Sequence, residues 1–322
     1  MEIYNVRKIN RSTTMNNQLV WIKLGLTTFF WALMFYLGKY AVAYMSPESI
    51  SGWRFLLAGL VLAPVVAMRE GLDWQGLKRN AVPLLIMAVV GIGGFNLALF
   101  HGLRYTSPVN TSLIMALCPA LIAVFGALLT GERIGLRQQA GLALGILGVV
   151  VVISGGSLAV LLALSFQRGD LFILLAATCW AIYSTIPKRF ITGLPSLQVT
   201  VGTVSLGGLL LSVYANTTQV DFFILPPLGV VTAIVAMSLL GSVLAYIWWN
   251  DGVRQVGAGM AAMFMNLVPI FAALIGVVLG QAITLAQIMG AVLVVGGVWL
   301  ATTQSASPAR SPLELDVAKH KS

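Results

Sequence analysis

Long apolar segments alternate with short polar connections along nearly the whole chain. Ten of these segments are long enough to cross the roughly 30 Å of hydrocarbon in a bilayer, at residues 19–45, 47–68, 81–103, 106–130, 135–155, 170–192, 195–215, 226–250, 255–279 and 284–303. The connections are mostly short, which is typical of packed antiparallel helices and leaves no room for a globular domain. The pattern predicts an all-α polytopic membrane protein with ten transmembrane helices.

Three segments fall outside this pattern. Residues 1–18 are polar and basic, and residues 304–322 are polar with two prolines, so we expect both to be disordered tails. No small-residue cleavage site follows the first apolar segment, which argues against a cleaved signal peptide. The stretch Ser157–Phe166 is apolar but too short to span, and is either an extension of the fifth helix or an interfacial segment.

The two halves of the chain match each other in register. Trp31 and Lys39 recur 149 residues later as Trp180 and Lys188. Further matches, 149 or 150 residues apart, join Gly102, Arg104 and Pro119 to Gly252, Arg254 and Pro269, and Gly131, Gln138, Gly141 and Gly148 to Gly280, Gln287, Gly290 and Gly297. We therefore expect two repeats, at residues 19–155 and 170–303.

Each repeat contains five spans, and this odd number has a topological consequence. The second repeat must enter the membrane from the opposite side, so the repeats are predicted to be inverted. Many secondary transporters have this architecture, with a substrate site near the bilayer midplane between the halves.

The composition supports a membrane protein. Hydrophobic residues make up 58% of the 322 and charged residues 9%, against roughly 25% charged in soluble domains. The mean hydropathy is +0.92. Cys118 and Cys179 lie in apolar segments and indicate neither a disulfide nor a metal framework, so we expect no metal and no cofactor.

The net charge of +9 is informative through its distribution. The basic residues occupy short connections and form no basic face, which argues against a nucleic-acid partner. If the N-terminus is cytoplasmic, fifteen Lys and Arg residues fall inside and two, Arg104 and Arg168, fall outside. This bias predicts two cytoplasmic termini, and we expect a multi-pass protein of the bacterial inner membrane.

An ordered set of motifs resembles the drug/metabolite transporter superfamily, EamA type. The set comprises Trp31 followed by Lys39, Arg54 within Trp53-Arg54-Phe55, a span with Pro119, and Gly131-Glu132-Arg133 followed by Gln138, Gly141 and Gly148. The resemblance covers about residues 20–303. It implies a ten-helix carrier with both termini inside, a central cavity, and amino acids or related metabolites moved outward. The second repeat has Gly280-Gln281 where the first has Gly131-Glu132, which suggests that the acidic motif matters in one half only.

Aromatic and polar side chains deep within the spans are candidates for lining a substrate cavity. They are Trp31, Phe35, Asn96, Trp180, Tyr183, Tyr246, Trp249 and Asn266. Helical spacing places Trp31 on one line with Phe35, and Tyr246 on one face with Trp249. Polar groups at membrane depth are costly unless they face a cavity or a partner. The alternatives are lipid or core contact for the rings, and interhelical hydrogen bonds for the polar groups.

Three charged or titratable residues are candidates for gating or electrostatic roles. Lys39 and Arg54 could attract a substrate carboxylate or a gate partner. The alternatives are snorkelling of the side chain to the headgroups or, for Arg54, a structural contact with carbonyls at a helix end. His101 could form a pH-sensitive gate or be a structural residue with satisfied hydrogen bonds.

Prolines and glycines indicate where the helices bend and approach closely. Pro119 and Pro269 lie mid-span at equivalent positions and predict kinks, either as hinges or as static bends. Small-residue faces in the fifth and tenth spans allow close helix approach. We expect these two spans to form scaffold outside the cavity, with a homodimer contact as the alternative.

No Asp or Glu lies in the middle of any span, which argues against a cationic drug as the main cargo. The sequence thus predicts a carrier of a small-molecule substrate, exporting an amino acid or a similar metabolite by alternating access. Alternatives are an exporter of sugars, nucleotide derivatives or drugs, and a channel or structural membrane protein. A membrane enzyme would need clustered catalytic residues, and the chain has two histidines, so we expect no enzymatic activity.

Overall fold

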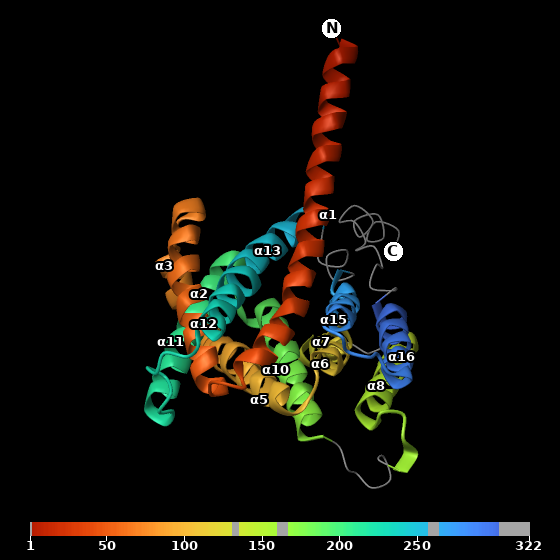
Figure 1. Ribbon diagram of the computed structural model, residues 1–322. Helices are drawn as coiled ribbons and strands as arrows, with labels where there is room; N and C mark the ends of the chain where they lie inside the picture. The colour runs from red at the N-terminus through yellow and green to blue at the C-terminus, as the bar shows by residue number, and fades with distance from the viewer. Residues whose placement is uncertain (1, 131–134, 160–166, 257–263, 303–322) are drawn as a thin grey trace, which may run out of the picture.

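The computed structural model describes residues 2–130, 135–159, 167–256 and 264–302, and every regular element in these ranges is helical (Figure 1). The helices are α1 (Glu2–Ala41), α2 (Pro47–Glu70), α3 (Trp74–Arg79), α4 (Ala81–Met87), η1 (Ala88–Gly94), α5 (Phe95–Tyr105), α6 (Pro108–Met115), α7 (Cys118–Thr130), α8 (Leu136–Ser154), α10 (Arg168–Phe190), α11 (Ser196–Thr218), α12 (Leu228–Ala236), η2 (Met237–Leu244), α13 (Ala245–Val256), α15 (Leu267–Val278) and α16 (Leu285–Thr302). The predicted all-α class is confirmed.

Seven helices of the described part are long and apolar enough to cross a membrane, at Leu19–Ala41, Pro47–Glu70, Ala81–Tyr105, Pro108–Leu129, Arg168–Pro187, Ser196–Thr218 and Leu228–Gly252. Three shorter apolar helices, Gln139–Val152, Leu267–Val278 and Leu285–Gly297, stand where the fifth, ninth and tenth spans are predicted. Within the described residues, seven of the ten predicted spans therefore contain a helix long enough to cross the membrane.

The expected disorder of residues 1–18 is not what the structure has. Helix α1 begins at Glu2 and continues without interruption to Ala41, and its N-terminal part extends away from the bundle (Figure 1). The segment between Glu2 and Lys23 contains neither glycine nor proline. Because extending an existing helix costs much less than starting one, the first span can propagate its helix into this polar segment.

The third span of each half changes its winding in the middle. In the first half, α4 passes into the π-helical segment η1 and then α5, and in the second half α12 passes into η2 and then α13. Ala88 and Met237, where the two π-helical segments begin, are 149 residues apart. The structure therefore repeats the offset found in the sequence, and π-helical turns frequently occur at functional sites.

The fourth and ninth spans are interrupted near Pro119 and Pro269, where kinks are predicted. Helix α6 ends at Met115 and α7 begins at Cys118, and the second half has a turn at Met265 and Asn266 before α15. A proline ring clashes with the carbonyl four residues earlier. Four residues before Pro119 and Pro269 are Met115 and Met265, so each interruption lies where this clash is expected.

Equivalent helices of the two halves pack in pairs through glycine. A Cβ atom built on Gly208 of α11 would lie 2.6 Å from the Phe55 backbone of α2, and one on Gly148 of α8 would lie 2.8 Å from the Gly290 carbonyl oxygen of α16. Such distances require backbones in direct contact. The glycine faces of the fifth and tenth spans therefore meet each other within the molecule.

Several sequence features fall outside the described residues. They are the Gly131-Glu132-Arg133 motif, the C-terminal tail at residues 304–322, most of the stretch Ser157–Phe166, and the side chain of Lys188.

Candidate substrate cavity

A central cavity is formed by helices of both halves, with a volume of about 90 Å³. By the same measure a single water molecule needs about 10–15 Å³, so the cavity has room for a small organic molecule. Its lining comes from α1, α2, α5, α6, α7, α10, α13 and α15 and from the turns that precede α7 and α15. None of the lining residues belongs to α8 or α16, in accordance with the scaffold role expected for those spans.

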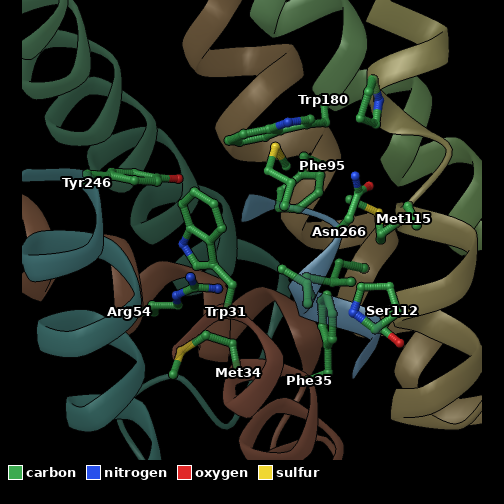
Figure 2. A pocket seen from close by; sticks show the side chains of 16 residues that line it. Trp31, Met34, Phe35, Arg54, Phe95, Ser112, Met115, Trp180, Tyr246 and Asn266 are labelled. Atoms are coloured by element: carbon green, nitrogen blue, oxygen red, sulfur yellow. The ribbon is translucent and has the colours of Figure 1, made fainter. Parts of the chain in front are cut away.

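Eight residues singled out in the sequence line this cavity: Trp31, Phe35, Arg54, Pro119, Trp180, Tyr246, Asn266 and Pro269 (Figure 2). Eight further lining residues were not predicted: Met34, Phe95, Leu99, Ser112, Met115, Ala116, Met265 and Val268. Most of these are aliphatic or sulfur-containing side chains that are common throughout the spans. The interruptions before Pro119 and Pro269 are the signal that could have found four of them, Met115, Ala116, Met265 and Val268.

Trp31 is held by a polar contact with the second half. Its indole Nε1 donates to the Gly241 carbonyl oxygen of η2 at 3.3 Å, and its ring packs on Trp249 with centroids 5.2 Å apart. A π-helical turn shifts the regular hydrogen-bonding pattern, and the Trp31 indole supplies a donor to one of its carbonyls. Trp31 thus has a fixed ring orientation at the cavity wall.

Trp180 is the repeat partner of Trp31 but has a different environment. Its ring packs between Phe95 and Tyr183, each with a centroid distance of 5.3 Å. In η1, the Ile92 carbonyl oxygen accepts a hydrogen bond from Asn96 Nδ2 at 2.8 Å. The indole N–H of Trp180 makes no hydrogen bond to any described residue, although Trp180 lines the cavity.

Arg54 is a buried cation in the cavity wall, with 5% of its surface exposed. Its Nε donates to Ser242 Oγ and its Nη1 donates to Asn96 Oδ1, both at 3.2 Å. Its guanidinium carbon lies 4.9 Å from the ring centroid of Phe55. These neutral partners connect α2 to α5 and η2.

Three predicted cavity residues lie behind the lining. Asn96 is 1% exposed and uses its amide on Arg54 and Ile92, so it makes the interhelical contact that was the alternative. The Tyr183 hydroxyl lies 3.3 Å from Thr203 Oγ1, and its ring supports that of Trp180. Trp249 supports Trp31 in the same way.

Two gating candidates lie at the end of the bundle that carries the α1–α2 connection. Lys39 Nζ donates to the Arg104 carbonyl oxygen at 3.1 Å. His101 Nε2 lies 3.0 Å from Glu48 Oε1, and its ring stacks on Phe172. Neither Lys39 nor His101 lines the cavity.

A carboxylate that no sequence pattern singled out, that of Asp221, lies at the same end. Asp221, in the α11–α12 connection, accepts hydrogen bonds from Ser46 N at 2.6 Å, Ser46 Oγ at 2.8 Å and Ser49 Oγ at 2.6 Å. Partial burial by itself raises the pKa of Asp221, but the hydrogen bonds from the two serines outweigh it and hold the pKa below its ordinary value. The Ser-Pro-Glu-Ser sequence at residues 46–49 is a helix-capping signal, but its partner 172 residues away carried no signal.

Two more hydrogen bonds join the halves near this end. The Tyr36 hydroxyl of α1 donates to the Ala272 carbonyl oxygen of α15 at 2.6 Å. Gln287 Nε2 of α16 donates to Asn110 Oδ1 of α6 at 2.8 Å. Together with Asp221, they hold the two halves against each other on the α1–α2 side of the cavity.

The described residues contain no cluster of three or more His, Cys, Asp or Glu side chains that could hold a metal ion. Cys118 and Cys179 are free thiols in the described part of the chain. What the cavity offers is aromatic surface, a cation and a few polar groups, which suits binding of a small molecule.

The chain is similar to known membrane transporters. The model of the EamA-like transporter family matches residues 19–154 and 167–303. The uncharacterized transporter YyaM of Bacillus subtilis is 37% identical over 88% of this chain and 93% of its own length. The aromatic amino acid exporter YddG of Ancylobacter novellus is 25% identical over 80% of this chain and 88% of its own length.

A solved crystal structure shows the same fold, with a TM-score of 0.63 at 23% identity. It covers 87% of this chain and 97% of its own.

Proposed function

Because the chain belongs to the EamA-like transporter family, we propose that it is a secondary carrier that exports amino acids or related small metabolites across the bacterial inner membrane. The observation that carries this proposal is the central cavity, which both halves of the molecule line. The proposed substrates are small molecules with an apolar or aromatic part and one polar end.

The chemistry of the wall supports this substrate class. Trp31, Phe35, Phe95 and Trp180 present aromatic surface, and Met115 adds an adaptable thioether (Figure 2). Sugars carry hydroxyl groups all around the ring and need many hydrogen-bond partners, which this mostly apolar wall supplies less well. A relative of similar length is named as an aromatic amino acid exporter.

Alternating access would use the interruptions that the two halves share. The turns before Pro119 and Pro269 border the cavity from opposite halves, and discontinuous helices at the repeat interface are typical of secondary carriers. With both termini cytoplasmic, as the distribution of Lys and Arg indicates, the α1–α2 end faces outward. The hydrogen bonds of Tyr36, Gln287 and Asp221 would then close the outer side, and export would require them to break.

A ligand screen with purified protein tests the proposal. Thermal stabilisation is measured with phenylalanine, leucine, glucose and tetraphenylphosphonium. We expect phenylalanine and leucine to raise the melting temperature in a saturable manner, and glucose and the lipophilic cation to have little effect.

Two variants link the effect to the cavity. Trp180→Ala should abolish the stabilisation by phenylalanine, whereas Trp74→Ala should leave it intact, because Trp74 in α3 is 65% exposed and absent from the lining. Equal stabilisation by glucose, or an unchanged response in Trp180→Ala, would count against the proposal.

A further inference from the structure

Arg54 lies where a charged side chain is energetically unfavourable. It lies seven residues into α2, about 10 Å along the helix axis from Pro47, in a span that crosses roughly 30 Å of hydrocarbon. It is 5% exposed. A buried cation without a counter-ion is strongly disfavoured in a low-dielectric interior, so its position calls for a physical reason.

The described part of the protein gives Arg54 no counter-ion. The hydrogen-bond partners of its side chain are Ser242 and Asn96, and its guanidinium lies over the rings of Phe55 and Phe100. All of these are neutral. The ion pair found in the described residues joins His101 to Glu48 and does not involve Arg54.

The unused donor capacity of Arg54 is available at the cavity. A guanidinium has five N–H groups, and its Nη2 makes no hydrogen bond to any described residue. Arg54 lines the cavity on the side of Trp31 and Tyr246, while Phe95, Met115 and Asn266 lie across the view (Figure 2). The site therefore has one cationic side and one largely apolar side.

Trp180 adds a second donor without an acceptor. Its indole N–H makes no hydrogen bond to any described residue, whereas the indole N–H of Trp31 donates to the Gly241 carbonyl oxygen. Neither donor is matched by a carboxylate anywhere in the lining. Arg54 and Trp180 thus give the cavity wall hydrogen-bond donors and a positive charge that no carboxylate of the lining matches.

We propose that Arg54 binds the carboxylate of the transported molecule, so that the substrate class is small apolar carboxylates. This inference rests on the proposed transport function and specifies the polar end of its substrate. An incoming carboxylate supplies the missing counter-ion and can accept from Arg54 in the bidentate geometry that guanidinium favours. The apolar part then lies against Phe95, Met115 and Trp180. A zwitterionic amino acid and a simple carboxylic acid share this chemistry.

The test uses ligands on one phenyl frame that differ only in their polar end. They are phenylalanine with both charges, 3-phenylpropionate with the carboxylate alone, and phenethylamine with the ammonium alone. Dissociation constants are measured by calorimetry with purified protein in nanodiscs. We expect at least one of the two carboxylates to bind the wild type at least ten times more tightly than phenethylamine does. The ratio of phenylalanine to 3-phenylpropionate decides between a zwitterion and an anion.

The variants separate substrate binding from the role of Arg54 in joining helices. In Arg54→Gln, we expect carboxylate binding to weaken at least tenfold while phenethylamine binding is retained, so that the preference disappears. Arg54→Lys should recover part of the preference, since it keeps the charge but loses the bidentate geometry. Lys39→Gln removes a cation outside the cavity and should leave the preference unchanged.

The possible failures are distinct. If none of the three ligands binds the wild type, the proposed function fails. If they bind without a carboxylate preference, or if Arg54→Gln keeps the wild-type ratio, the function stands and the role of Arg54 is overturned. Should Arg54→Gln lose all three ligands together, the residue is structural, and the inference is equally refuted.

Discussion

The two repeat-related tryptophans show how one residue type serves two purposes. Trp31 uses its indole N–H on the Gly241 carbonyl, whereas Trp180 lines the cavity and its indole N–H bonds none of the described residues. Their surroundings differ as well, since Asn96 bonds the Ile92 carbonyl in the first half and its counterpart 150 residues later is Tyr246. Equivalent positions in the two halves therefore differ in how they use the indole N–H.

Substitution by phenylalanine should separate these purposes. Trp31→Phe leaves the buried Gly241 carbonyl without its side-chain donor, which costs about 1–3 kcal/mol, so we expect a lower melting temperature. Trp180→Phe keeps the ring contacts and removes no hydrogen bond to a described residue. Its melting temperature should stay near that of the wild type, while ligand affinity falls several-fold in calorimetry. If Trp180→Phe lowered the melting temperature and Trp31→Phe lowered only the ligand affinity, the stabilising hydrogen bond would belong to Trp180 and not to Trp31.

Asp221 determines a pH dependence at the α1–α2 end. Because hydrogen bonds hold its pKa below the ordinary value of 3.8, its contribution to folding is fully present above that value. The contribution is lost as the pH falls through the lower pKa of the folded state.

Asp221→Asn removes the charge but keeps the shape. At pH 7 we expect a melting temperature lower by about 1–2 °C, corresponding to roughly 1 kcal/mol in a protein of this size, and the difference should shrink below pH 4. Thermal denaturation at several pH values measures both. A difference that grows at low pH would contradict the role assigned to Asp221.

At the level of helices, glycine decides how closely α8 and α16 approach. A Cβ on Gly148 would lie 2.8 Å from the Gly290 carbonyl oxygen, whereas the nearest atom to a Cβ on Gly296 is a Leu144 methyl carbon at 3.9 Å. Gly148→Ala should lower the melting temperature, because the two backbones must separate. Gly296→Ala should raise it slightly, since alanine favours helix by up to about 1 kcal/mol. Equal effects of the two substitutions would show that the contact contributes nothing.

The prolines test whether the helix interruptions take part in transport. Pro119→Ala and Pro269→Ala restore an N–H and relieve the clash one turn earlier. If the interruptions serve as hinges, each variant should bind ligand within about twofold of the wild type but exchange it several-fold more slowly. Calorimetry and exchange in proteoliposomes give the two quantities. Unchanged exchange in both variants would leave the interruptions as static bends.

Some features of the helices could be predicted from the sequence and others could not. The apolar pattern identified the spans, and Pro119 and Pro269 predicted both interruptions, because these are local effects of the chain. The π-helical segments η1 and η2 carried no recognised signal. The burial of Asn96 could not be predicted either, since it depends on Arg54, which comes from a different helix.

On the scale of the whole molecule, the duplication explains the cavity. Both halves contribute an interrupted helix and a cavity-facing tryptophan, and the glycine-paired helices α8 and α16 stay outside the lining. The register of the repeats and the number of spans predicted a shared centre from the sequence. The hydrogen bonds that join the halves at the α1–α2 end could not be predicted, because they link residues as distant in the sequence as Tyr36 and Ala272, 236 residues apart.

The central claim is that this cavity carries a substrate alternately to either side of the membrane. Counterflow of labelled phenylalanine in proteoliposomes tests it most directly, with unlabelled phenylalanine or an empty buffer inside. The account predicts saturable uptake that internal phenylalanine accelerates, and loss of that acceleration in Trp180→Ala but not in Trp74→Ala. Uptake that rises linearly with concentration and ignores the internal ligand would show a channel and contradict the account.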